Sequence, residues 1–253
     1  MKRTVLAIAL LLLSAAGEAA AQTREAAFVA GTSKECPGCD LTDADFKMRN
    51  LAGANLAGAI LTGAIFHRAN LEGANLAGAT IDQSNLNKSI LRRANLSGAN
   101  LKGSFLYEAD LSGANLTGAN LAEVRAMESR MIATRLQNAD LTLGDFENAV
   151  MNNANLSGAN LNAAFFQGAN MNRVDFTRAK GQQVYLNHAD LLSANLSGAV
   201  LTLTNFTKTN FTRANLSGAD FSRSSFAGAN FFEADTTGTK FTGATMPDNT
   251  VGR

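Results

Sequence analysis

Two histidines and two cysteines are the residues of this chain that could serve catalysis, redox exchange or metal binding. The histidines are His67 and His188, and Cys36 and Cys39 are separated by one Pro and one Gly. Acid–base or nucleophilic catalysis needs its groups within hydrogen-bond reach of one another, and a structural zinc site needs four ligands. The elements that position these side chains therefore decide which chemistry is available.

The cysteine pair has several possible roles. In an oxidising compartment Cys36 and Cys39 could form a disulfide, and we favour a structural staple near the start of the folded region. A redox-active pair is the alternative, but the surrounding sequence has no βαβ pattern of the kind that holds such motifs. Asp40 follows the motif where c-type haem attachment requires His, and only two histidines could complete a zinc site.

The chain around these residues has a fixed five-residue period. Large apolar residues recur at every fifth position from Leu41 to Met246, in 42 repeats whose only exceptions are Ala126, Gly181 and Thr236. A small residue stands two places before each of them, except at Arg49. This period fits neither a helix nor a plain strand and indicates a solenoid. The block Ala-Asn-Leu-Ser-Gly recurs at multiples of twenty residues, which indicates four sides per coil.

These repeats resemble the pentapeptide-repeat family, whose motif is A(D/N)LXX. The resemblance covers 39–246 and implies an all-β fold, a right-handed quadrilateral β-helix of about ten coils. At roughly 4.8 Å per coil, the spacing of adjacent strands, the rod would be about 50 Å long. Residues 122–135 have the weakest repeat pattern. We interpret them as a distorted coil because the twenty-residue phase continues across them, with a protruding helix as the alternative.

This geometry argues against an enzyme. His67 and His188 fall on one side of the coil, but six coils apart, which is roughly 29 Å. No Gly-rich loop stands between a strand and a helix where it could hold a phosphate. We therefore predict no catalytic residues, no metal site and no cofactor.

The two ends of the chain lie outside the repeats. Residues 1–21 have two basic residues, an apolar run and a small-residue cleavage pattern, which predicts a signal peptide and a periplasmic or secreted protein, with no stable membrane span. Without this segment the chain has 20 basic and 20 acidic residues, so its charge gives no reason to expect nucleic acid as a partner. We expect residues 22–38 to form a tail or cap that closes at Cys39, and 247–253 to form a C-terminal tail.

Sorting the repeats by side separates the outward residues into columns. One side carries mixed charges, another is almost uncharged, and a third has large apolar and aromatic residues at outward positions. We predict that this third column is an interaction stripe for a protein partner, although scattered surface hydrophobes with no role fit the pattern about as well. The stripe comprises Ile65, Phe105, Tyr107, Met127, Phe165 and Tyr185.

The last coils are rich in Phe, and no long helix follows to cover them. Phe226, Phe231 and Phe241 mark a candidate region for end-to-end homodimerisation, a property that the family resemblance implies for some members. We predict a non-enzymatic scaffold that mediates protein–protein interaction through a face or an end. The alternative, a DNA-mimic that protects a type II topoisomerase, would need a cytosolic location and an acidic rod, so we rank it lower.

Overall fold

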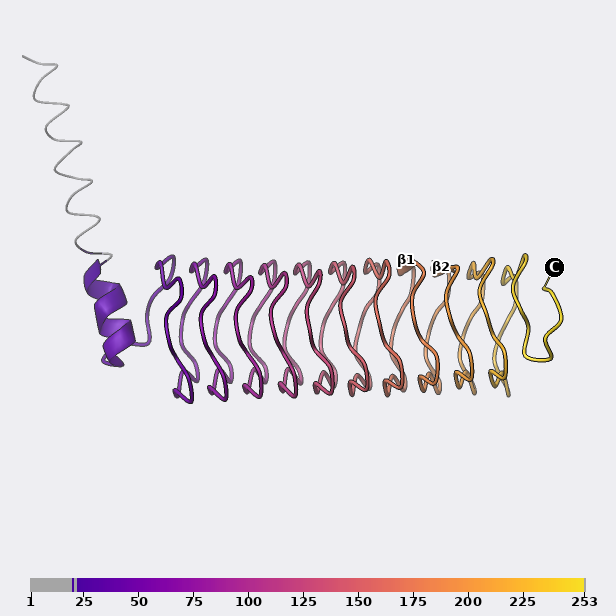
Figure 1. The fold of residues 1–253 in the computed structure, drawn as a ribbon, viewed down its shortest axis with the longest axis horizontal. Coiled ribbons are helices and arrows are strands. Elements are labelled where there is room, and N and C mark those ends of the chain that lie inside the picture. The colour runs from indigo at the N-terminus through magenta and orange to yellow at the C-terminus, as the bar shows by residue number, and fades with distance from the viewer. Residues whose placement is uncertain (1–19, 21, 253) are drawn as a thin grey trace, which may run out of the picture.

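The protein is a rod of stacked coils with a short helix at one end (Figure 1). The computed structural model describes residue 20 and residues 22–252. Apart from residue 20, the predicted signal peptide (1–21) lies outside the described residues. Residues 22–30 are helical, and the coils follow.

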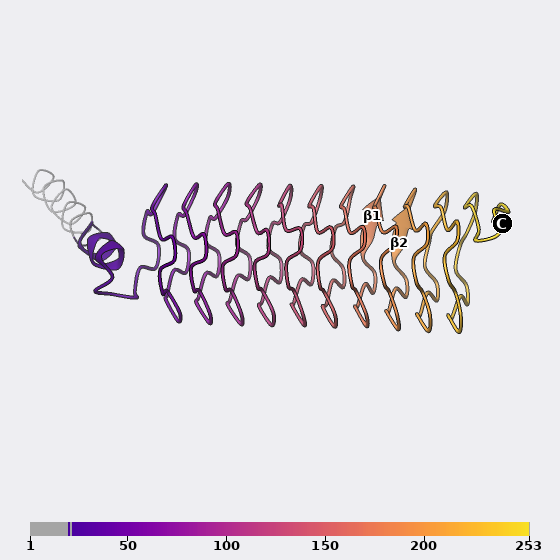
Figure 2. The same ribbon diagram turned by 60° about the horizontal axis from the view of Figure 1, so that its bottom comes forward.

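Each coil takes twenty residues. Parallel β-bridges join residues twenty apart in an unbroken series, from Glu35 with Asn55 to Ser225 with Thr245. Among the described residues, only two segments are long enough to be strands, β1 (Lys180–Gln182) and β2 (Val200–Thr202), and they lie side by side in parallel (Figure 2). Each coil has four sides, which stack into walls. We call them walls A, B, C and D, starting from the repeats centred on Leu41, Phe46, Leu51 and Leu56.

The interior is built from two residues per side, one large and one small. Leu96, Leu116 and Leu156 lie on wall D, and each is 0% exposed. Their small partners are also buried, as at Ala94, which is 1% exposed. Some small positions carry a hydroxyl, and Ser84 Oγ donates to the carbonyl of Leu61 at 2.6 Å. A buried hydroxyl is therefore accepted here because a main-chain oxygen of the preceding coil satisfies it.

The corners explain the preference for Asn and Asp just before each large residue. The Oδ1 of Asn155 accepts the N–H of Ser157 at 2.8 Å, which closes a local turn. The next residue of the corner has a positive φ, such as +64° at Gly98. Glycine adopts this conformation without steric strain, although Arg93 also takes it, with φ at +56°.

Two irregular stretches of sequence remain within the coil. Residues 122–135 form an ordinary coil, with bridges from Phe105 to Arg125 and from Asp110 to Arg130, so the predicted distortion is absent. At Gly181 the large inward side chain is missing. An added Cβ would lie 2.7 Å from Val184 Cγ2, so Val184 occupies the space that a larger residue would need.

The segment before the coils covers the N-terminal end of the rod. Phe28 of the helix is 0% exposed and packs edge-on against Phe46, with ring centroids 5.6 Å apart. Cys36 and Cys39 are disulfide-bonded, and both lie in the core. Cys36 extends the series of large inward positions by one repeat before Leu41, and Cys39 is the small inward residue two places before Leu41.

Candidate interaction surfaces

The two histidines first considered for catalysis do not meet. His67 and His188 both lie on wall B, on coils that are six turns apart. Across the described residues, no group of three or more His, Cys, Asp or Glu side chains is placed to hold a metal ion. The remaining candidates for a functional site are surfaces of the rod that could bind a partner.

The predicted apolar stripe is not continuous. The outward column of wall B includes Ile65, Phe105 and Phe165, but the bridges place Arg125 and Asp145 between Phe105 and Phe165. Most of the stripe is half-buried, including Ile65 and Met127. The column therefore splits into two groups, one around Phe105 and one at Phe165.

The group around Phe105 is partly covered by charged side chains. The Arg125 guanidinium lies over the Phe105 ring at 5.2 Å, and Lys88 Nζ lies 5.7 Å from the centroid of Tyr107. Lys88 also pairs with Glu108 at 3.2 Å. The hydrogen bond that Tyr107 gives to Glu108 raises the pKa of the tyrosine and lowers the pKa of the carboxyl. The cations occupy ring faces that a partner would otherwise use.

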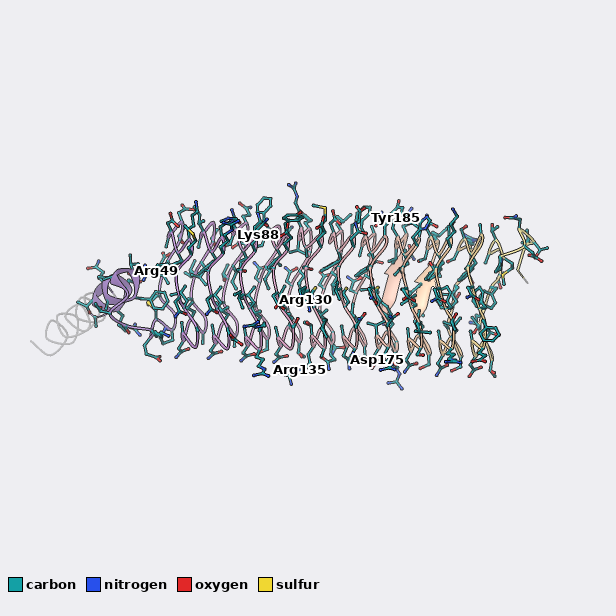
Figure 3. All side chains as sticks on the ribbon, turned by 90° about the horizontal axis from the view of Figure 1, so that it is seen from below. Arg49, Lys88, Arg130, Arg135, Asp175 and Tyr185 are labelled. Atoms are coloured by element: carbon teal, nitrogen blue, oxygen red, sulfur yellow. A yellow bond between two sulfur atoms is a disulfide. The ribbon has the colours of Figure 1, made fainter. Side chains whose placement is uncertain are left out.

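The second group is a pair of stacked rings. Phe165 and Tyr185 come from adjacent coils, with ring centroids 4.9 Å apart and planes within 6° of parallel. Tyr185 is 38% exposed, and Phe165 is half-buried beneath the same surface. Tyr185 points away from the rod on the side opposite Arg135 (Figure 3). The pair offers an outward aromatic surface held in place by two neighbouring coils.

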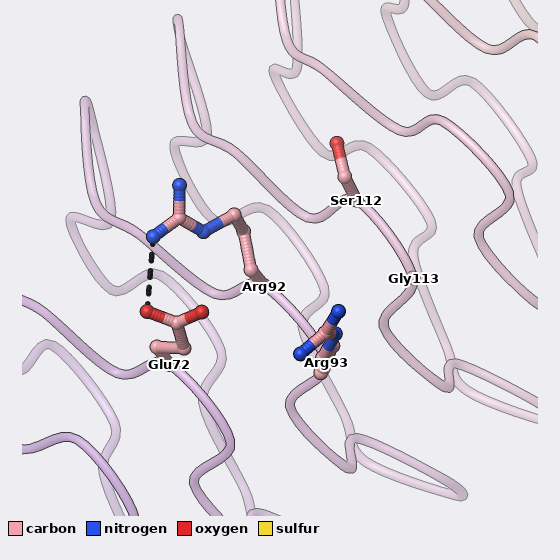
Figure 4. Close-up of a pocket in the computed structure, with 5 residues that line it drawn as sticks. All are labelled: Glu72, Arg92, Arg93, Ser112 and Gly113. Atoms are coloured by element: carbon pink, nitrogen blue, oxygen red, sulfur yellow. Dashed lines mark hydrogen bonds and ion pairs between the residues drawn. The ribbon is translucent and has the colours of Figure 1, made fainter.

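Wall C carries a shallow polar groove (Figure 4). Its lining comprises Glu72, Arg92, Arg93, Ser112 and Gly113. Arg92 Nη2 donates to Glu72 Oε2 at 2.9 Å, and this bond lowers the pKa of the Glu72 carboxyl. The sequence had predicted a wall of offsetting charges, and these two residues pair as that prediction requires.

The N-terminal half of wall D is a ladder of asparagines. The Nδ2 of Asn75, Asn95 and Asn115 each donates to the Oδ1 of the asparagine one coil earlier, at 3.2–3.3 Å. The Oδ1 of Asn75 and the Oδ1 of Asn95 each also accept a hydrogen bond from a main-chain N–H two residues later. The side chains are thus held by the coil itself, and this part of the wall is almost uncharged.

The C-terminal coil is the least covered part of the core. Phe226 is fully buried, whereas Phe231 and Phe241 are only partly buried although they point inward. Phe241 contacts Phe226 and Phe231, with centroids at 5.5 and 6.2 Å. Next to them Phe232 is 61% exposed. The sequence analysis missed Phe232 because its position after the large residue is usually small or polar.

Other exposed apolar residues were also missed. Met48, Leu143 and Leu203 occupy corner positions with positive φ and are 46–65% exposed. The sequence could have revealed these exposed residues, because the corner positions that they occupy normally carry Gly or a polar residue. They lie on separated coils and form no common surface. In the part of the chain that the structure describes, we find no helix with the length and apolarity needed to cross a membrane.

Comparison with known proteins agrees with this architecture. The family model described as pentapeptide repeats matches residues 39–76, 69–106, 106–142, 145–178, 182–218 and 209–246. Among solved structures, the chain is similar to HetL from the cyanobacterium Nostoc sp. strain PCC 7120, a protein involved in regulating heterocyst differentiation. The two are 25% identical, with a TM-score of 0.72, over 89% of this chain and 96% of HetL.

A more distant similarity is to QnrB1, a plasmid-mediated fluoroquinolone resistance protein, in a trypsin-treated form. It is 19% identical over 81% of this chain and 90% of the other, with a TM-score of 0.35. A search of curated proteins finds no match.

Proposed function

Because the chain belongs to the pentapeptide-repeat family, we propose that it is a non-enzymatic scaffold of the periplasm or the extracellular space that binds another protein. The observation that carries the proposal is the stacked pair of Phe165 and Tyr185 on wall B. Aromatic residues are enriched in the cores of protein interfaces, and a rigid outward pair loses little side-chain entropy on binding. We include in the proposal a right-handed winding of about ten coils.

The distribution of polar groups supports a binding role over a catalytic one. Many Asn and Asp side chains of the coil are committed to corner turns, as at Asn155, and several buried hydroxyls donate to main-chain oxygens, as at Ser84. The two histidines are separated by six coils. What the rod offers instead is a set of long walls with fixed side-chain positions.

A matched pair of variants tests the proposed binding surface. Chains with Phe165→Ser and Tyr185→Ser, with Leu143→Ser on wall A as the control, would be immobilised and exposed to periplasmic extract. We expect the double variant to lose the partner that the unchanged chain retains, and the control to keep it. Equal retention by all three chains would show that the aromatic pair is not the binding surface.

The export step has a separate test. The proposal expects the protein in the cell envelope, with a mature N-terminus at Gln22. Fractionation followed by N-terminal sequencing would check this. Recovery in the cytosol with Met1 or the following residue at the N-terminus would refute export and would favour the topoisomerase alternative.

We also propose that the Phe-rich C-terminal end is a site of homotypic contact. The partly buried rings of Phe231 and Phe241 and the exposed ring of Phe232 support this proposal. Sedimentation equilibrium would detect such a dimer, and a monomeric mass at every concentration would contradict it.

A further inference from the structure

The hydrogen bonds between coils have a direction. The N–H groups of Leu76 and Gly78 both donate forward, to the carbonyls of Asn95 and Ser97 on the next coil, at 2.7 and 2.9 Å. The N–H of Asn95 donates backward, to the carbonyl of Ala74, at 2.9 Å. Each side of a coil therefore projects two donors and one acceptor toward the C-terminal end. It projects one donor and two acceptors toward the N-terminal end.

The C-terminal end leaves these groups open on parts of its last coil. In the described part of the chain, five forward N–H groups there donate no hydrogen bond, namely those of Phe231, Glu233, Thr236, Gly238 and Phe241. The tail covers only the corner into wall B and that wall itself, where Gly252 donates to Ala244 and Met246 donates to Thr250. This end is thus an unpaired edge on walls C and D and on part of wall A.

The N-terminal segment, in contrast, lies over its edge and satisfies some of its main-chain groups. Glu25 of the helix accepts the backward N–H of Asp40 at 2.9 Å, and Lys34 Nζ donates to the carbonyl of Ala52 at 2.6 Å. Phe28 fills the space beneath Phe46, where another coil would otherwise stack. The helix lies across this end of the rod (Figure 1).

Arg49 holds the helix in this position. It is the one residue that breaks the rule of a small residue two places before each large one, and its guanidinium donates to the carbonyls of Val29 and Phe28 at 2.8 and 3.4 Å. These oxygens belong to the last turn of the helix, where main-chain acceptors lack partners and the helix dipole favours a cation. Arg49 lies beside the helix (Figure 3).

From this geometry we propose that the N-terminal helix blocks head-to-tail assembly of this chain, and that the partner it excludes is the C-terminal end of a second copy. Two C-terminal ends facing each other would oppose four donors to two acceptors on each side, so the ladder cannot continue between them, and the homotypic contact proposed above would rest on the rings of Phe231, Phe232 and Phe241 alone. A C-terminal end facing an uncovered N-terminal end would match the open donors of walls C and D, and of the uncovered part of wall A, with acceptors. Such a contact is heterologous and does not close, so it would propagate into a filament.

The test uses the full chain with Phe28→Ala and Arg49→Ala, which remove side chains that hold the helix against the rod. We call this variant the undocked chain. Arg24→Ala, on the exposed face of the same helix, is the matched control. We expect the undocked chain to show a sedimentation mass that exceeds that of a dimer and keeps rising with concentration. Electron microscopy should show filaments one rod wide. The control should sediment as the unchanged chain does.

Mixing the undocked chain with the unchanged chain gives a second readout. The unchanged chain can add its C-terminal end to an uncovered N-terminal end, but its own helix then stops growth. Excess unchanged chain should therefore shorten the filaments, which a general loss of solubility would not predict. An undocked chain that keeps its far-UV circular dichroism and sediments like the unchanged one would overturn the proposal, as would filaments that the unchanged chain does not shorten.

A single Arg49→Ala variant covers the case in which the double variant unfolds. It removes only the contact to the helix end and leaves Phe28 in the core. We expect it to assemble more weakly than the double variant but above the control. The same sedimentation mass as the control at all concentrations would contradict the proposed block. Neither result depends on the partner proposed for wall B.

Discussion

Replacing alanine by glycine at certain corners should stabilise this protein, although the same change destabilises most regular structure. Ala133 and Ala163 stand at corner positions with φ at +53° and +52°. Alanine has no polar side chain to lose there, so the substitution isolates the backbone conformation. At the equivalent corner of Gly98 an added Cβ would meet nothing within 4 Å, which shows that the strain there is conformational and not a clash.

The expected size follows from two opposing terms. A non-glycine residue in the left-handed region is strained by roughly 1–2 kcal/mol. Glycine removes that strain, but it gives the unfolded chain more freedom, which costs about 0.4–1 kcal/mol. Each substitution should therefore raise the free energy of unfolding by about 0.5–1 kcal/mol. The N–H of Ala133 donates to Asn152, and a glycine would keep this bond.

Ala122 provides the control, because it is the corner residue directly before Glu123, which has a positive φ, and Ala122 itself does not have one. Ala122→Gly should lower the free energy of unfolding by about 0.5–1 kcal/mol. Urea denaturation followed by circular dichroism, with unchanged slopes, would measure all three variants. A loss of stability in Ala133→Gly and Ala163→Gly equal to that in Ala122→Gly would refute the reasoning.

Three further predictions concern the core, the acid range and the disulfide. Leu156→Ala, at a position with 0% exposure, should lower the free energy of unfolding by about 2–5 kcal/mol in urea denaturation, and a loss below 1 kcal/mol would place the side chain outside the packed core. The hydrogen bond from Ser222 lowers the pKa of Asp220 below its usual value near 4. The stabilisation that this hydrogen bond provides is therefore fully present above the usual pKa, and it is lost as the pH falls through the lower pKa of the folded protein. Ser222→Ala should therefore reduce stability at neutral pH and make no difference at strongly acidic pH, and an effect that does not change with pH in thermal unfolding would contradict this. Reduction of the bond between Cys36 and Cys39 should destabilise the protein by about 2 kcal/mol, because the closed loop is short, and an unchanged unfolding midpoint after reduction would disprove it.

The five-residue period was sufficient to predict the interior. It placed Leu96, Leu116 and Leu156 on one inward wall, and all three are buried there. The reason is physical, since a coil whose sides all carry the same inward pair has one way to bury them. The same phase carried the prediction through residues 122–135, which form an ordinary coil.

The surfaces and the ends were less predictable. Arg49 stood out as an exception, but its partners lie in a helix that has no repeat, so the period says nothing about their position. Arg125 was placed beside Phe105 by the twenty-residue spacing, yet the contact of its guanidinium with the ring depends on side-chain conformation. Phe232 lies at a position that the repeat leaves to solvent, so the period alone could have predicted its exposure.

The most direct test of the coil is the formation of engineered disulfides between residues twenty apart. Asn95 and Asn115 are bridged partners on wall D, and adjacent strands lie roughly 4.8 Å apart, within the range that a disulfide spans. In a chain with Cys36→Ser and Cys39→Ser, we expect Asn95→Cys with Asn115→Cys to oxidise readily. Asn95→Cys with Asp110→Cys, closer in sequence but on different walls, should stay reduced. Readier oxidation of the second pair than of the first would contradict the four-walled coil.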